Sequence, residues 1–151
     1  MILERGNMWD VFGKTDLFLV TTNPIRRKDG ACVMGRGIAL ECAKRFPKFP
    51  YLLGDEIRLM EMDDQRVNAG IVGVFDKQVM GYFMVKEHWQ REAKPGIIRK
   101  SVSDLLDEMT ILQPGRVDLN FPGIGNGKLR REDVLPIIAH LPDNVHVWEY
   151  G

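Results

Sequence analysis

The chain has 151 residues, of which 44% are hydrophobic and 28% charged, the balance of an ordinary globular domain. We expect a single domain over residues 1–151, large enough to build a core without a disulfide or a metal. Lys+Arg and Asp+Glu both number 21, so the formal net charge is zero, which argues against a protein that coats nucleic acid through bulk charge.

The first half of the chain is expected to alternate between strands and helices. A short strand is expected at 1–4, and the continuous apolar, β-branched run at 17–22 predicts a buried strand. A basic loop follows at 24–30. A helix is predicted over 37–46, where Pro47 and Pro50 close it, and a second helix over 51–62.

The second half continues the alternation. Strands are predicted at 70–75 and 81–85 around a turn at 76–78, followed by an amphipathic helix over 97–109. Residues 117–121 form a strand that runs into a glycine loop, residues 134–141 a helix that Pro136 perturbs in its first turn, and residues 145–150 a closing strand. This order predicts an α/β fold, a three-layer α/β/α sandwich around a mixed, mostly parallel sheet.

Two cysteines, Cys32 and Cys42, show no paired spacing, so we expect free thiols in a reducing compartment. Glu4 and Arg5 interrupt the start before a signal-peptide stretch can form, and no apolar run has the length of a bilayer span. We therefore expect a cytoplasmic protein with no membrane partner, in a bacterial cell or in a host cell if the gene is viral.

Two glycine-rich loops have the chemistry of an anion site. The first spans 33–39 and precedes a helix, and the second spans 122–128 and follows a strand. Glycine lets the backbone approach a ligand closely, and successive N–H groups then form an anion-binding nest. Neither loop is a known nucleotide motif. A Walker loop would need a glycine at Pro122 and a hydroxyl at Leu129, and a Gly-x-Gly-x-x-Gly fingerprint would need a glycine at Lys128.

At these loops the sequence resembles the macrodomain family, which binds ADP-ribose. The resemblance covers nearly the whole chain and rests on the stretches 6–8, 20–24, 35–39 and 122–127. The stretches 33–47 and 86–91 are similar to the branch that holds the DarG antitoxins and the terminal ADP-ribose glycohydrolase. That branch removes ADP-ribose from modified macromolecules, and the antitoxins remove it from thymine bases in DNA.

The resemblance implies a ligand-binding role for a set of residues along the pocket. Asn23 would bind the distal ribose, one loop would pack against that ribose and the diphosphate, and the other would wrap the diphosphate. Asn7 stands where the family has an aspartate that meets adenine, and Trp148 either lies beside adenine or packs in the core. The implied ligand-binding residues are Asn7, Met8, Asn23, Met34, Gly35, Arg36, Gly37, Ile38, Gly123, Ile124, Gly125, Asn126, Gly127 and Trp148.

Lys86 is the catalytic residue that the resemblance implies, as a nucleophile at the anomeric carbon of the distal ribose. A free lysine has a pKa of about 10.4, so the site must lower it through burial or a nearby cation, for which Arg36 is the candidate. His88 is a candidate acid or base, although a structural histidine is the commoner case. No spacing of His, Cys and carboxylates predicts a metal, and no cofactor is expected.

Three functions therefore fit the sequence. The first is a glycohydrolase that releases ADP-ribose, with ADP-ribosylated DNA as the favoured substrate and an ADP-ribosyltransferase toxin as the cognate partner. The second is a non-catalytic module that binds ADP-ribose, and the third is a phosphatase of ADP-ribose 1″-phosphate. The basic loop Arg26, Arg27 and Lys28 is either a nucleic-acid rim near the pocket or a solvated loop.

Overall fold

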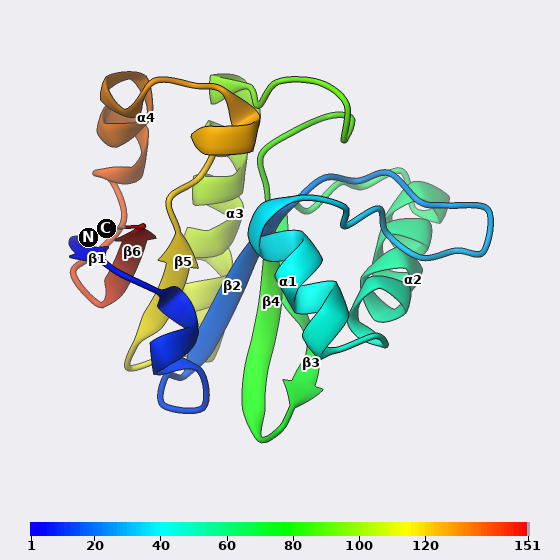
Figure 1. Cartoon of the computed structure of the whole chain (residues 1–151), viewed down its shortest axis with the longest axis horizontal. Helices are drawn as coiled ribbons and strands as arrows, with labels where there is room; N and C mark the ends of the chain where they lie inside the picture. Colours follow the sequence, from blue (N-terminus) through cyan, green and yellow to red (C-terminus); the bar gives the residue numbers. More distant parts are fainter. Residues whose placement is uncertain (151) are drawn as a thin grey trace.

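Six strands form one sheet in the order β1-β6-β5-β2-β4-β3 in the computed structural model, which describes residues 1–150 (Figure 1). All neighbouring strands are parallel except the antiparallel pair β3 and β4. The strands are β1 (Ile2–Arg5), β2 (Leu17–Thr22), β3 (Ala69–Phe75), β4 (Gln78–Met84), β5 (Val117–Asn120) and β6 (Val145–Glu149). The expected mixed, mostly parallel sheet is confirmed.

Helices cover both faces of this sheet, which gives three layers. They are α1 (Gly37–Arg45), α2 (Phe49–Met62), α3 (Pro95–Leu112) and α4 (Arg131–Ile138), with short 3-10 turns η1 (Met8–Val11) and η2 (Gly125–Gly127). One apolar cluster joins the sheet to α3 and α4, and the other joins it to α1, α2 and η1. The side chains of β2 alternate between the two clusters, Leu17 and Leu19 in one and Phe18 and Val20 in the other, as expected of a strand buried on both faces.

Several element boundaries differ from the sequence expectation, and two of these differences have clear local reasons. Asp76 and Lys77 both have positive φ, 47° and 67°, which is the geometry of a two-residue hairpin turn. Gln78 therefore belongs to β4 and not to the turn. Helix α4 begins at Arg131, three residues before the predicted start, so that Pro136 lies inside the helix.

Both cysteines are free and buried, as the absence of a pairing pattern predicts. Burial raises the pKa of each thiol to about 12, so neither is a reactive thiolate near neutral pH. Within residues 1–150, no helix has both the length and the apolar composition required to cross a bilayer.

Candidate functional site

A cleft of ≈ 730 Å³ opens at the carboxyl ends of β2, β4, β5 and β6. This is the edge of an open parallel sheet where ligands bind, and the volume suits a nucleotide-sized molecule. The ladder between β2 and β5 ends at the pair Leu19 and Leu119. Beyond it the Asn120 side chain bridges the strands, accepting from Thr21 N at 3.1 Å and donating to Thr21 Oγ1 at 2.8 Å. The crevice begins where backbone pairing stops.

The first glycine loop forms one wall of the cleft at the start of α1. Gly37 has φ of +55°, and a Cβ there would lie 3.2 Å from Asn126 Nδ2 of the second loop. Gly35 differs from Gly37, because its φ is not positive and a Cβ would meet nothing within 4 Å. The fold itself therefore tolerates a side chain at Gly35, and the open space lies in the cleft.

The second loop forms the facing wall and runs through η2. Gly123 and Gly125 have φ of +81° and +67°, a left-handed conformation that favours glycine. A Cβ at Gly123 would meet Ile98 Cδ1 at 2.7 Å, whereas one at Gly125 would meet nothing within 4 Å. Gly123 thus serves packing, while Gly125 faces open space.

Asn23 lies in the cleft wall and fixes the loop that follows β2. Its Nδ2 donates to Val33 O at 2.9 Å, and its Oδ1 accepts from Ile25 N at 2.8 Å. The residue is 7% exposed. Each end of the amide therefore has one partner within the protein, and one donor and one lone pair are left for a ligand.

Lys86 follows β4 and reaches the second loop, where its Nζ donates to Asn126 O at 3.3 Å. Its pKa is lowered from the ordinary value, first by burial and then by the charges of Arg36 and Lys128. No carboxylate among residues 1–150 forms an ion pair with any of these three cations. The site therefore favours the neutral amine more than solvent does.

Aromatic side chains also line the cleft. Trp148 lines it, and its Nε1 donates to Asp118 Oδ1 at 2.7 Å. Asp118 is fully buried and also accepts from Arg116 Nε at 2.9 Å. Tyr150 lies at the rim, where its hydroxyl donates to Glu41 Oε1 at 3.1 Å. Trp148 thus packs against the core through Asp118 and also lines the cleft, so its position is compatible with both roles considered from the sequence.

The fold is similar to that of solved macrodomain structures. The macrodomain of DarG from Mycobacterium tuberculosis superposes with a TM-score of 0.71 at 25% identity, covering 99% of this chain and 97% of that one. The macrodomain of DarG from Thermus aquaticus gives 0.70 at 22% identity over 99% and 97%. The chain has the macrodomain fold.

Two further comparisons bear on its relatives. DarTG from Thermosipho africanus, in complex with ADP-ribose, superposes with a TM-score of 0.75 at 16% identity, covering 99% of this chain and 41% of that one. The DNA ADP-ribosyl glycohydrolases of Mycobacterium tuberculosis and Mycobacterium bovis are 27% identical over 139 residues, which is 87% of this chain and 39% of theirs. This macrodomain thus spans well under half of the curated relatives it matches. No model of a protein family matches the chain.

The macrodomain brings most of the residues singled out from sequence to one cleft. Lys86, Asn23, both glycine loops and Trp148 line it. Three do not, namely Asn7, Met8 and Met34. Asn7 instead caps η1 by accepting from Trp9 N at 3.0 Å, and Met8 and Met34 are buried in the core beside α1.

The basic loop lies beside α2 (Figure 1), where the Tyr51 hydroxyl donates to Asp29 Oδ2 at 2.9 Å. Arg26 pairs with Glu61 at 2.8 Å and Arg27 with Asp29 at 2.9 Å, and neither these residues nor Lys28 line the cleft. Of the two alternatives for this loop, the solvated loop fits the structure better, because two of its three charges are paired within the protein.

Other cleft residues were not singled out from sequence. Most lie at or directly after the carboxyl ends of strands, a position that signals a ligand edge in parallel sheets. Trp89 belongs to the stretch that resembles the DarG branch, but its place in the wall depends on how its loop folds. The additional lining residues are Thr21, Thr22, Val33, Ala39, Val85, Trp89, Asn120, Phe121, Glu149 and Tyr150.

Proposed function

We propose that this macrodomain is an ADP-ribosyl glycohydrolase that releases ADP-ribose from a modified macromolecule, with ADP-ribosylated DNA as the substrate. The observation that carries the proposal is the position of Lys86. Its amine lies between two glycine loops suited to a diphosphate, and burial, Arg36 and Lys128 all lower its pKa. A pure binding pocket has no need of a neutral amine, whereas a nucleophile does.

The chemistry would run at the anomeric carbon of the distal ribose. Lys86 Nζ would attack this carbon, and the bond to the macromolecule would break with its electron pair leaving on the departing group. Nζ would lose a proton, and water would then release ADP-ribose and restore the amine. The two loops would hold the diphosphate through backbone N–H groups, so binding would not depend on Lys86.

Two comparisons support the choice of substrate. Curated relatives at 27% identity are DNA ADP-ribosyl glycohydrolases, and a structural neighbour is in complex with ADP-ribose. In this reading the modification comes from a partner ADP-ribosyltransferase, and the protein acts in the cytoplasm where that partner acts.

The experiment is a parallel assay of three substrates: an ADP-ribosylated oligonucleotide, an ADP-ribosylated protein and ADP-ribose 1″-phosphate. Wild-type protein should release free ADP-ribose from the oligonucleotide. Lys86→Ala should lower turnover by about 100-fold or more while retaining most of the affinity for ADP-ribose. Lys77→Ala, at the opposite end of the sheet, is the control and should leave turnover unchanged.

Each other outcome would assign a different function to this protein. Binding of ADP-ribose with no release from any conjugate would make this a binding module. Release of phosphate from ADP-ribose 1″-phosphate alone would make it a phosphatase. Wild-type turnover by Lys86→Ala would remove this lysine from the mechanism.

A further inference from the structure

The three tryptophans of the chain are held differently. Trp9 and Trp148 each donate their indole N–H to a carboxylate, Glu41 Oε2 at 2.8 Å and Asp118 Oδ1 at 2.7 Å. Trp89 lines the cleft and is only half-buried, and its indole makes no hydrogen bond to another residue in 1–150. Its ring stacks on His88 instead, with centroids 5.7 Å apart and an interplanar angle of 24°. A large aromatic surface is thus displayed beside the reactive lysine without a structural anchor of its own.

The loop that carries Trp89 is nevertheless fixed at its base. Lys94 N donates to Val85 O at 3.0 Å, and Ala93 N donates to Gly127 O at 2.9 Å. Lys94 Nζ also pairs with Glu87 at 2.8 Å. Figure 1 shows this β4–α3 connection beside η2, above the carboxyl ends of the strands. The base of the loop that presents Trp89 to the cleft is therefore held by hydrogen bonds and an ion pair.

Four cations in the cleft or in the loops beside it have no ion-pair partner among residues 1–150. Arg36, Lys86, Arg91 and Lys128 form no ion pair with any residue in 1–150, although other cations near the cleft, such as Arg131, do. The carboxylate in the cleft wall, Glu149, is bound to Arg131 at 2.9 Å and offsets none of them. Positive charge without an ion pair therefore lies in the cleft at Arg36 and Lys86, and at Lys128 close enough to lower the pKa of Lys86, although the net charge of the chain is zero.

We infer that Trp89 is the residue that selects a nucleic-acid leaving group, by stacking on a nucleobase of a single strand whose phosphates lie against Lys128 and Arg91. The inference rests on the proposed function. Single strands are bound by this combination of an aromatic face and a basic surface, because every base has a face to stack and every linkage a charge to neutralise. A protein leaving group offers neither a planar base nor a regular row of phosphates, so the same loop favours nucleic acid over protein conjugates.

The test measures binding of an unmodified leaving group, so it does not need catalysis. A fluorescein-labelled single-stranded oligonucleotide is titrated with protein saturated with ADP-ribose, and its anisotropy is followed. Trp89→Ala should weaken this binding about tenfold or more, and Trp89→Phe should retain most of it. The affinity of both variants for free ADP-ribose, measured by calorimetry, should fall by a smaller factor than their affinity for the oligonucleotide.

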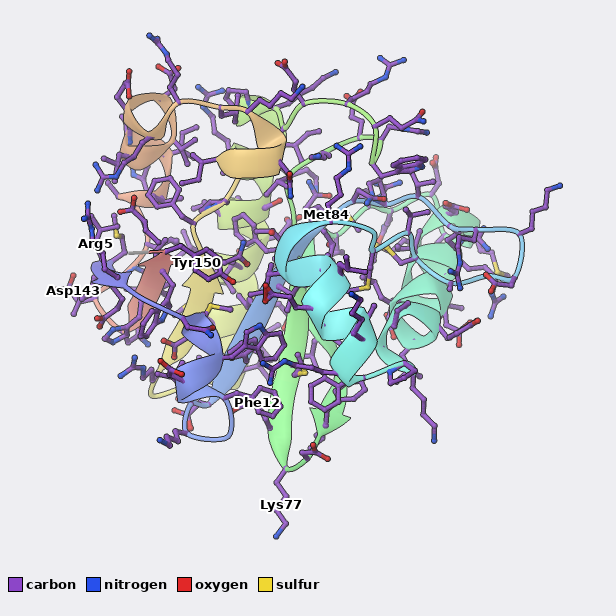
Figure 2. The ribbon with its side chains drawn as sticks, in the orientation of Figure 1. Arg5, Phe12, Lys77, Met84, Asp143 and Tyr150 are labelled. Carbon is purple, nitrogen blue, oxygen red and sulfur yellow. The ribbon has the colours of Figure 1, made fainter. Side chains whose placement is uncertain are left out.

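A matched pair of lysines tests the charge. Lys128 and Lys77 both have positive φ, 63° and 67°, and Asn tolerates that conformation. Lys128→Asn should reduce the slope of log affinity against log salt by about 0.7 for each lost phosphate contact on a single strand. Lys77→Asn should leave it unchanged, because Lys77 projects from the β3–β4 turn, at the opposite end of the molecule from Met84 at the carboxyl end of β4 (Figure 2).

The outcomes separate this inference from the proposed function. Oligonucleotide binding that depends on Trp89, in a protein that cleaves no conjugate, would support the stacking role of Trp89 and overturn the proposed glycohydrolase activity. Cleavage of DNA conjugates with wild-type KM by Trp89→Ala, together with unchanged oligonucleotide binding, would overturn the stacking role of Trp89 and leave the proposed activity in place. An equal loss of ADP-ribose and oligonucleotide affinity would make Trp89 part of ADP-ribose binding and would overturn its role in stacking on a nucleobase. A wild-type protein that does not bind the oligonucleotide would overturn that role as well.

Discussion

Gly127→Ala should separate the loop of Lys86 from the second glycine loop. A Cβ at Gly127 would lie 2.9 Å from Ala93 Cβ, while its next neighbours, Ala93 N and Cα, are at 3.8 and 4.0 Å. Carbon atoms prefer a separation of about 3.5–4.0 Å, so the two segments must move apart by roughly 0.6–1.1 Å. The clash therefore involves a single methyl group, and the backbone around it stays in ordinary contact.

The energetic cost follows from that displacement. Overpacking a buried contact of this size costs about 1–3 kcal/mol in the free energy of unfolding. The hydrogen bond from Ala93 N to Gly127 O, now 2.9 Å, spans the same junction and should lengthen as well. Because Lys86 Nζ contacts Asn126 O across this junction, a displacement approaching 1 Å should lower kcat by up to about 100-fold.

Ala93→Gly is the matched compensating change, because it removes the methyl group that clashes. Alone it should cost about 1–2 kcal/mol through the lost methyl burial and the added chain entropy. The double variant should be no less stable than Ala93→Gly, which corresponds to a coupling of about 1–3 kcal/mol. Urea unfolding followed by tryptophan fluorescence gives these values, provided that the m-value stays constant. Additive losses in the double variant, or a Gly127→Ala variant as stable as wild type, would refute this account of the junction.

Three further predictions concern the cleft. Gly35→Glu should abolish ADP-ribose binding while thermal stability stays close to that of wild type. The fold leaves space for a side chain at this position, but the added carboxylate would repel a diphosphate. Retained affinity in calorimetry would contradict the assignment of this loop to the ligand. Arg36→Met should move the rising limb of kcat against pH to higher pH, because a lost cation raises the pKa of Lys86; an unmoved limb, measured at saturating substrate, would exclude that coupling. Trp148→Phe should lower the free energy of unfolding by about 1–3 kcal/mol, because buried Asp118 loses a donor, and urea unfolding at wild-type stability would count against it.

The sequence alone determined the elements and the general place of the site. Hydrophobic periodicity and turn residues act over a few neighbours, so the strand 17–22, the amphipathic helix before β5 and both glycine loops could be located from local pattern. The rule that ligands meet the carboxyl ends of parallel strands then placed the two loops together. Boundaries shifted where backbone conformation decided them, as at Asp76 and Lys77, whose positive φ values leave Gln78 to the strand.

Only the tertiary structure decided which charges and aromatic rings are available to a ligand. The sequence left open whether Arg26 contacts nucleic acid or solvent, because its partner Glu61 lies 35 residues away and no local pattern links the two. Lys128 seemed only to break a nucleotide motif, yet it approaches Lys86 closely enough to lower its pKa. Ion pairing depends on distances between segments that meet only when the sheet assembles. Whether a charge is paired or free is therefore a property of the fold. The structure leaves cations of the cleft unpaired, whereas it pairs two of the three charges of the loop at 26–28.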